Sequence, residues 1–388
     1  MQGFTWALVG ASLVVFGTSA CGGSDSNGGT SGSSGAGVDS GSGGSSQAGR
    51  AGATGGAGGS SAGQTAAGQA GSTTTTAGGG GQAGASGGES GGSGGSSGGA
   101  GGGPLPPELT WVREGPSRVL EDIWGSGPED IYAVGRNGNL VHSKGDGTWT
   151  LQTTDTGANL TGVWGSSATD VYVSANANLI LHSTGDGSWQ HQVYASGYTF
   201  RGVWGLDADN VYLVGPGVVH GGAGGWGTAQ VVSNASPTFA IWGSSPADLY
   251  VTSGAAATSI VYHSAGDGRW TPQTAPSGNA ADAIWGLDAN RVFVGADYTI
   301  ASSTGNGQWT PEITVPAPRR VNAIWGAGPD AVYACTQDGY FYRSNGSGSW
   351  SDGQRIDANL GITCYGMWGS GSDDIYLATS GGVYRGRP

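Results

Sequence analysis

The stretch LTGVWGSSATDVYVSA, residues 160–175, returns along the chain with small changes. Forty residues earlier the sequence is LEDIWGSGPEDIYAVG (120–135), and forty later it is FRGVWGLDADNVYLVG (200–215). Each copy carries Trp-Gly and, eight residues after the Trp, an aromatic residue. The Trp-Gly pairs lie 38 to 43 residues apart, at Trp124, Trp164, Trp204, Trp242, Trp285, Trp325 and Trp368. The chain therefore contains seven repeats of about 40 residues.

Each repeat is typical of four short strands. In the second repeat they are LTGVWG (160–165), DVYVSA (170–175), NLILHS (178–183) and SWQHQV (188–193), separated by segments rich in turn residues. Four strands in a repeat of this length indicate a blade of a β-propeller. The sequence predicts an all-β fold, a seven-bladed β-propeller spanning residues 108–388.

A second tryptophan closes each of the first six repeats, at Trp149, Trp189, Trp226, Trp270, Trp309 and Trp350. The seventh repeat reaches Pro388 without one, whereas Trp111 precedes the first repeat in ELTWVREG (108–115). We therefore expect the segment around Trp111 to supply the outer strand of the last blade. This pairing closes the ring and removes its loose edges.

The recurring residues of the inner strand are interpreted as architecture. Blades pack face to face, so Trp and the apolar residue before it are expected to fill the two sides of the strand. The residue two before each Trp is Gly or Ala, except for Asp122, and is expected to leave space for an indole of the next blade. The Gly after Trp is expected to permit a turn, and Asp170 and Asn210 to bond turn amides.

The third turn of the repeat carries a resemblance. SKGDGTW (143–149), STGDGSW (183–189), SAGDGRW (264–270), STGNGQW (303–309) and SNGSGSW (344–350) resemble a shortened Asp-box, the turn of BNR-repeat propellers such as sialidases, sortilin-type receptors and photosystem II stability-factor-like proteins. The resemblance implies the propeller fold and leaves function open, because the group includes hydrolases, receptors and assembly factors. In such a turn Asp146, Asp186 and Asp267 are expected to accept bonds from backbone N–H groups.

Composition restricts the partners. The net charge is −13, the sequence pI is about 4.5, and Lys144 is the single lysine of the chain. Nucleic-acid binding needs clusters of Lys and Arg that this chain lacks, so no nucleic-acid partner is expected.

The N-terminus indicates export. Residues 1–21 have an apolar segment from Trp6 to Phe16 and end in TSAC, which resembles the lipobox of bacterial lipoproteins, with Cys21 as the lipidated residue. Cleavage after Ala20 to give a secreted protein is the alternative. Residues 22–107 are mostly Gly, Ser, Ala and Thr and are expected to form a disordered linker. We expect an outer-membrane or cell-surface lipoprotein, or a secreted protein, held at the membrane through its N-terminal lipid.

Two cysteines remain, Cys335 and Cys364, in neighbouring repeats. In an exported protein such a pair is expected to form a disulfide, with two free thiols as the alternative.

Catalytic motifs are weak. A sialidase-like site would need an arginine cluster, and Arg201, Arg319 and Arg320 do not form a convincing triplet in the sequence. The repeated histidines are expected to pack near the turns, because one residue per blade does not converge on a metal ion. These are His142, His182 and His263. No catalytic residue, metal or cofactor is predicted, and Glu121 with Asp282 is the one carboxylate pair that a glycoside hydrolase or lyase could use.

Comparison of the repeats points to binding. The position three before each Trp-Gly tryptophan varies freely, and it lies where the chain begins the inner strand, at the mouth of the central channel. The predicted binding residues at this position are Glu121, Arg201, Phe239, Asp282, Asn322 and Tyr365. We expect a monomeric, non-catalytic module that binds a glycan or an extracellular protein. A carbohydrate-active hydrolase or lyase, a purely structural envelope protein and loop variation without a ligand are the alternatives.

Overall fold

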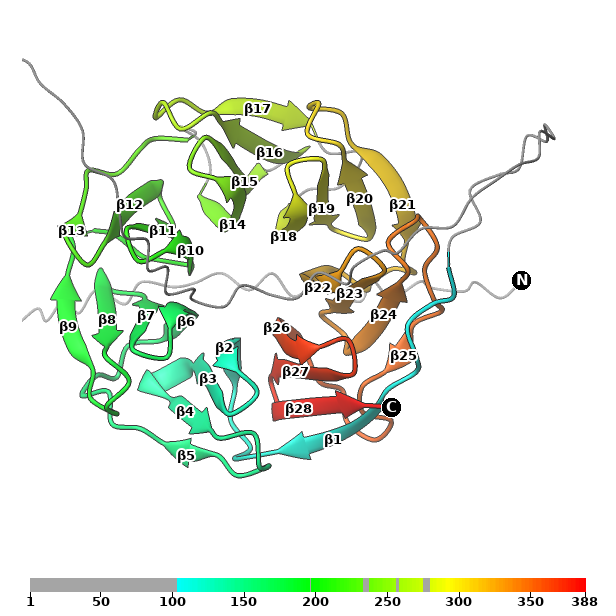
Figure 1. The fold of residues 1–388 in the computed structure, drawn as a ribbon, viewed down its shortest axis with the longest axis horizontal. Helices are drawn as coiled ribbons and strands as arrows, with labels where there is room; N and C mark the ends of the chain where they lie inside the picture. The colour runs from blue at the N-terminus through cyan, green and yellow to red at the C-terminus, as the bar shows by residue number, and fades with distance from the viewer. Residues whose placement is uncertain (1–102, 196, 233–236, 256–257, 275–279) are drawn as a thin grey trace, which may run out of the picture. The chain divides into compact units, whose positions relative to one another are not determined.

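The computed structural model describes residues 103–195, 197–232, 237–255, 258–274 and 280–388. Within them, seven four-stranded antiparallel sheets surround a central axis as the blades of a propeller (Figure 1). The predicted fold is confirmed. One short 3-10 turn, Arg136–Gly138, follows the second strand of the first blade. No helix in the described residues is long and apolar enough to cross a lipid bilayer.

The first strand of every blade lies at the centre of the ring. These inner strands are β2 (Leu120–Gly127), β6 (Leu160–Ser167), β10 (Gly202–Asp207), β14 (Thr238–Ser245), β18 (Ala281–Asp288), β22 (Val321–Gly328) and β26 (Cys364–Gly371). The second strands are β3 (Asp130–Gly135), β7 (Asp170–Ala175), β11 (Asn210–Val214), β15 (Asp248–Ala255), β19 (Arg291–Ala296), β23 (Ala331–Thr336) and β27 (Asp374–Thr379).

The outer half of each blade holds the third and fourth strands. The third strands are β4 (Leu140–Ser143), β8 (Leu179–Ser183), β12 (Val218–Gly222), β16 (Thr258–Ser264), β20 (Thr299–Ser303), β24 (Tyr340–Ser344) and β28 (Gly382–Arg387). The fourth are β5 (Thr150–Leu151), β9 (Gln190–Val193), β13 (Gly225–Trp226), β17 (Thr271–Thr274), β21 (Thr310–Thr314), β25 (Gln354–Arg355) and β1 (Thr110–Glu114). Blades one to six run in chain order from β2–β5 to β22–β25, and blade seven consists of β26, β27, β28 and β1.

The ring closes as the sequence predicts. Strand β1 pairs antiparallel with β28, and Trp111 lies opposite Gly386 in the register. The Trp111 indole packs edge-on against Phe341 of blade six, with ring centroids 4.8 Å apart. The first and last strands of the described residues, β1 and β28, therefore share one blade, at the lower right of Figure 1.

The segment before β1 is bound to blade six. Arg343 Nη1 donates to the Pro106 carbonyl at 2.7 Å, and Asn345 Nδ2 donates to the Gly103 carbonyl at 2.6 Å. Residues 103–107, which the sequence assigns to the linker, thus contact the propeller. Arg343 stands where blades one, two and four have a histidine, and this docking gives the departure a role.

The glycine after each inner tryptophan does not form the expected turn. Gly165 lies within β6, and a Cβ built on it would be 2.6 Å from the edge of the Trp124 indole of the preceding blade. The space for the indole is therefore provided here, and not two residues before the Trp as predicted. A Cβ on that earlier residue, Gly162, would lie 2.9 Å from the Cα of Gly202, so it permits close approach of neighbouring inner strands.

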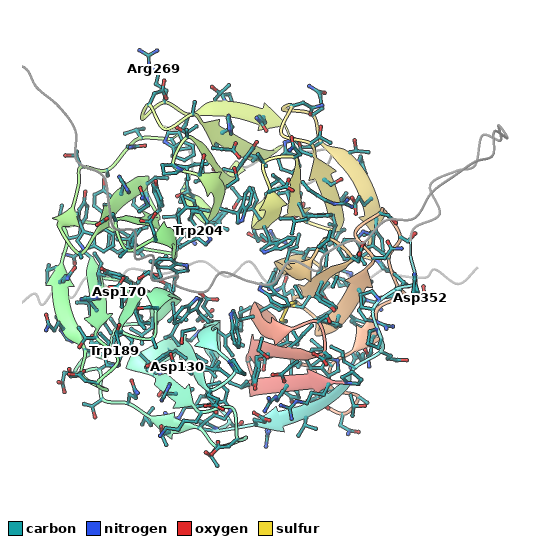
Figure 2. The ribbon with its side chains drawn as sticks, in the orientation of Figure 1. Asp130, Asp170, Trp189, Trp204, Arg269 and Asp352 are labelled. Carbon is teal, nitrogen blue, oxygen red and sulfur yellow. A yellow bond between two sulfur atoms is a disulfide. The ribbon has the colours of Figure 1, made fainter. Side chains whose placement is uncertain are left out.

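Cross-blade hydrogen bonds hold the closing tryptophans. Trp189 Nε1 donates to Gln152 Oε1 of the preceding blade at 2.8 Å, and Trp226 Nε1 donates to Gln192 Oε1 at 2.6 Å. The same bond joins four further pairs, Trp149–Glu114, Trp270–Gln230, Trp309–Gln273 and Trp350–Glu312. Figure 2 shows Trp189 farther from the axis than Trp204. These bonds therefore connect the outer parts of neighbouring blades, whereas the inner tryptophans pack near the centre.

The aspartates of the repeat act in two ways. Asp186 accepts a hydrogen bond from the backbone N–H of Ser188 at 2.9 Å, and Asp146 and Asp267 do the same for Thr148 and Arg269, as predicted. Asp170, labelled in Figure 2, does not bond turn amides in the structure. It accepts from Ser166 Oγ at 2.5 Å and lies 2.8 Å from His182 Nε2. A carboxylate sits between the hydroxyl and the imidazole, so this arrangement supports the turn and does not activate a serine nucleophile.

Candidate functional site: the mouth of the central channel

The inner strands enclose a channel with a volume of about 840 Å³. Its walls are the tryptophans and apolar residues of the seven inner strands. All six predicted binding residues line it: Glu121, Arg201, Phe239, Asp282, Asn322 and Tyr365. They lie at the start of the inner strands, and we call this set the channel mouth. The sequence prediction thus selects residues that the fold brings together from six blades.

A backbone irregularity accounts for the variable position. In the first blade the ladder between β2 and β3 shifts register between Leu120 and Asp122, so Glu121 is passed over. The same shift passes over Asp282 and Tyr365 in blades five and seven. Such a bulge re-aims a side chain that regular pairing would direct into a blade interface. These residues therefore vary between repeats without cost to the core.

Two of the mouth carboxylates are already paired. Glu121 Oε1 lies 2.7 Å from Arg136 Nε, and Asp282 Oδ2 lies 2.8 Å from Arg320 Nη2. Burial raises the pKa of Asp282, and the charge of Arg320 partly opposes this effect. The two carboxylates belong to blades one and five, which are not neighbours. Each is held by its own arginine, so the pair offered for glycoside hydrolysis has no arrangement that favours it.

Arg201 differs from the other charged residues of the mouth. Its guanidinium carbon lies 4.9 Å from the centre of the Phe239 ring, at cation–π distance. Partial burial lowers the pKa of Arg201, and the charge of Asp282 opposes this effect. Within the described residues no carboxylate lies at ion-pair distance from this guanidinium. Its N–H donors are therefore available to a ligand that enters the mouth.

Asp122 is a residue of the channel wall, at the position where the other repeats have Gly or Ala. Its Oδ1 accepts from its neighbour's amide, Ile123 N, at 2.9 Å, and its Oδ2 accepts from Val163 N of blade two at 3.0 Å. Burial nevertheless raises the pKa of Asp122 to about 7. The position is Gly or Ala in the other repeats, so this departure was the available signal for a titratable group in the channel.

Other contributors come from loops beside the inner strands and are not among the predicted binding residues. Arg136 and Gln337 follow second strands, and Thr363 precedes an inner strand. Gln337 and Thr363 line the channel together with Arg320. A repeat alignment restricted to the inner strand cannot find them, because their loops differ in length and residue type from blade to blade.

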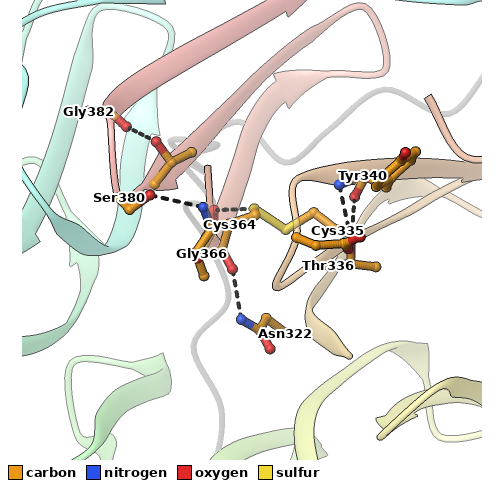
Figure 3. The surroundings of a disulfide bond; sticks show 11 residues. Asn322, Cys335, Thr336, Tyr340, Cys364, Gly366, Ser380 and Gly382 are labelled. Atoms are coloured by element: carbon orange, nitrogen blue, oxygen red, sulfur yellow. Dashed lines mark hydrogen bonds between the residues drawn. A yellow bond between two sulfur atoms is a disulfide. The ribbon is translucent and has the colours of Figure 1, made fainter. Parts of the chain in front are cut away.

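The disulfide expected between neighbouring repeats is present. Cys335 at the end of β23 and Cys364 at the start of β26 are bonded, and both are fully buried. Figure 3 shows this bond beside Asn322, whose Nδ2 donates to the Cys364 carbonyl at 2.9 Å. The bond thus joins blades six and seven directly behind two residues of the channel mouth, Asn322 and Tyr365.

Repeat, ring closure and channel together define the protein as a seven-bladed β-propeller. No family model and no curated protein matches the sequence. Solved structures that are similar in fold include YCF48 bound to a D1 peptide, with 14% identity and a TM-score of 0.60, covering 72% of this chain and 97% of that one. YCF48 from Cyanidioschyzon merolae is 15% identical with a TM-score of 0.59, covering 72% and 98%. Virginiamycin B lyase from Staphylococcus aureus is 15% identical with a TM-score of 0.63, covering 72% and 99%.

At these identities the likeness concerns the fold alone. The propeller prediction is confirmed, whereas the resemblance of the turns to the Asp-box of BNR repeats remains a prediction. The predicted signal segment, with Cys21 as its lipidation site, lies outside the described residues, as does most of the linker.

Proposed function

We propose that this chain is an exported binding module, displayed at the cell surface through a lipid on Cys21 or secreted, whose ligand sits over the channel mouth. The module is not an enzyme in this proposal. Its ligand is a glycan or an exposed segment of another protein.

The single observation that carries the proposal is the distribution of variation. Seven repeats keep nearly the same tryptophans, turns and cross-blade bonds, while the position three before each inner tryptophan, at the channel mouth, carries acid, base, aromatic and amide in different blades. Variation confined to one end of a uniform ring is the pattern of a binding surface.

The chemistry of the mouth supports an amphipathic ligand with an acceptor group. Phe239 and Tyr365 offer aromatic surface on different blades, and Arg201 offers donors. Aromatic rings with a few polar groups suit sugars and peptides alike. YCF48, a propeller of similar fold, has been solved with a peptide, and this supports a peptide as one arm of the test.

The test is capture on glycan and peptide arrays with the full chain. The double variant Arg201→Ala/Tyr365→Ala should lose the signal of the native protein, because it removes the free donors and one aromatic face. Arg269→Ala is the matched control, since Arg269 is an exposed arginine on an outer turn, away from the channel (Figure 2). Capture that survives the double variant, or that Arg269→Ala reduces equally, would refute the proposal.

The anchoring part of the proposal has its own measurement. Metabolic labelling with palmitate should mark the native protein and not the Cys21→Ala variant. A variant that is still labelled, or a native protein that is never labelled and stays inside the cell, would contradict display through Cys21.

A further inference from the structure

The Cys335–Cys364 disulfide occupies a pair of positions that recurs at every blade interface. One is two residues after the aromatic residue of the second strand, and the other is four residues before the next Trp-Gly tryptophan. Between blades one and two these positions hold Val134 and Leu160, which are buried in the same core cluster. Between blades five and six, a Cβ built on Gly295 would lie 2.6 Å from Cγ1 of Val321.

Apolar or small side chains thus make this contact elsewhere in the ring. The equivalent residues at the remaining interfaces are Ser174 with Phe200, Val214 with Thr238, Thr252 with Ala281, and Ala378 with Leu120. The propeller fold therefore does not require a covalent bond at this place, and the bond between blades six and seven needs another reason.

The surroundings of the disulfide supply that reason. Cys364 is followed at once by the bulged mouth residue Tyr365, and its carbonyl holds the side chain of Asn322 (Figure 3). On the other side, Cys335 is two residues from Gln337, which lines the channel and whose N–H donates to the Arg320 carbonyl at 2.8 Å. The bond thus joins the second strand of blade six to the inner strand of blade seven, close in sequence to Gln337 and Tyr365.

The connection that leads into Cys364 contains an exposed stretch next to the channel mouth. It runs from Arg355 to Thr363 and buries Ile356 and Ile362, whereas Asn359, Leu360 and Gly361 between them are exposed. Ile356 and Ile362 hold the two ends of the exposed stretch, and the Tyr384 hydroxyl donates to Asp357 Oδ2 at 2.7 Å. The disulfide fixes Cys364, the first residue of β26, directly after this connection.

We infer that the Cys335–Cys364 disulfide is a positioning element for the channel mouth. It holds Tyr365 and Asn322 in the geometry that the ligand meets, and the ring does not depend on it for its fold. This inference rests on the function proposed above. Reduction of the bond would loosen one sector of the mouth while the other blades stay packed. Because both sulfurs are fully buried, the bond is reached only when this sector opens.

The test uses the full chain with Cys335→Val/Cys364→Leu, which copies the pair of blades one and two. Hydrogen exchange in segments 336–341 and 357–366 should become about tenfold faster than in the native protein, because local opening is separate from global unfolding. The equivalent segments of blades one and two, 135–140 and 152–162, serve as the internal control and should be unchanged. If this variant fails to fold, the native protein reduced with dithiothreitol gives the same comparison.

Unaltered hydrogen exchange in segments 336–341 and 357–366 would overturn the inference. A rise in the exchange rate spread evenly over all seven blades would also overturn it. Capture of the array ligand by the Cys335→Val/Cys364→Leu variant should also fall about tenfold, while its thermal unfolding stays cooperative. Failure of the proposed function can be distinguished from failure of this inference. If the proposed function is wrong, the Arg201→Ala/Tyr365→Ala protein captures ligand as well as the native protein, whether or not hydrogen exchange changes in the cysteine variant. Localised exchange together with unchanged capture of a mouth-dependent ligand would also overturn the positioning role.

Discussion

Closure of the ring by its first strand can be tested with Trp111→Ala. The Trp111 indole is partly buried, packs against Phe341 and covers Gly386. Truncation of a large buried aromatic residue to Ala costs about 3–5 kcal/mol, and the low end applies here because Trp111 keeps some exposure. For a domain of about 290 residues the entropy of unfolding is roughly 0.6 kcal/mol per kelvin, so a loss of about 3 kcal/mol lowers Tm by roughly 5 °C.

The assay is differential scanning calorimetry of the native chain, Trp111→Ala and the matched variant Trp189→Ala. Trp189 occupies the same place in blade two, is 9% exposed and donates to Gln152. Its truncation should cost more, about 4–5 kcal/mol, because it also leaves the Gln152 oxygen unpaired. A Tm for Trp111→Ala within one degree of the native value would show that β1 does not complete blade seven, and the closed ring would have to be abandoned.

Three further changes test separate parts of the account. Burial raises the pKa of Asp122 to about 7, so the folded protein keeps a proton that the unfolded chain releases above about pH 4. The free energy of unfolding of the native protein should therefore fall by up to about 1.4 kcal/mol per pH unit between pH 4 and 7. Asp122→Ala should abolish this dependence. Equal slopes in urea titrations of both proteins would contradict this. Gln152→Leu removes the acceptor of Trp189 Nε1 and should lower the free energy of unfolding by about 1–2 kcal/mol in the same titration, so an unchanged midpoint would mean that the cross-blade bond contributes nothing. Arg343→His/Asn345→Thr introduces residues that other repeats carry at these positions and should release the segment before β1, seen as faster proteolysis at residues 103–109. Protection equal to that of the native chain would refute the docking.

The repeat made most of the architecture predictable. Seven Trp-Gly pairs and their partner aromatics gave the blade number, and the displaced Trp111 gave the closure, because a missing strand at one end and a spare one at the other have one simple solution. Strand bounds in the second repeat also agree closely, for example Asp170–Ala175.

Contacts between repeats were harder to predict. The sequence shows that a small residue follows each Trp, but not which indole it faces, so the role of Gly165 was assigned to a turn. The Gln or Glu residues that follow the closing tryptophans were missed for the same reason, although their spacing of three or four residues was visible. A bond such as Trp189–Gln152 joins different blades, and a repeat read one unit at a time does not reveal its partner.

The mouth was predictable in position but not in chemistry. Variation at Glu121 and Tyr365 located the channel mouth, and the structure explains the variation, because a residue passed over by the strand ladder is free to change. The partners Arg136 and Arg320, which neutralise two of the mouth carboxylates, come from loops without a repeat pattern. Only the structure therefore singles out Arg201 as the mouth cation that the described carboxylates leave without an ion pair.

The most direct test of the central claim is a structure of the full protein with the molecule that it captures. We predict that this molecule lies over the channel at the start of the inner strands, within hydrogen-bond distance of Arg201 and against Phe239 or Tyr365. A ligand bound instead at an outer strand, or at the turns that carry Asp130 and Asp170, would contradict it.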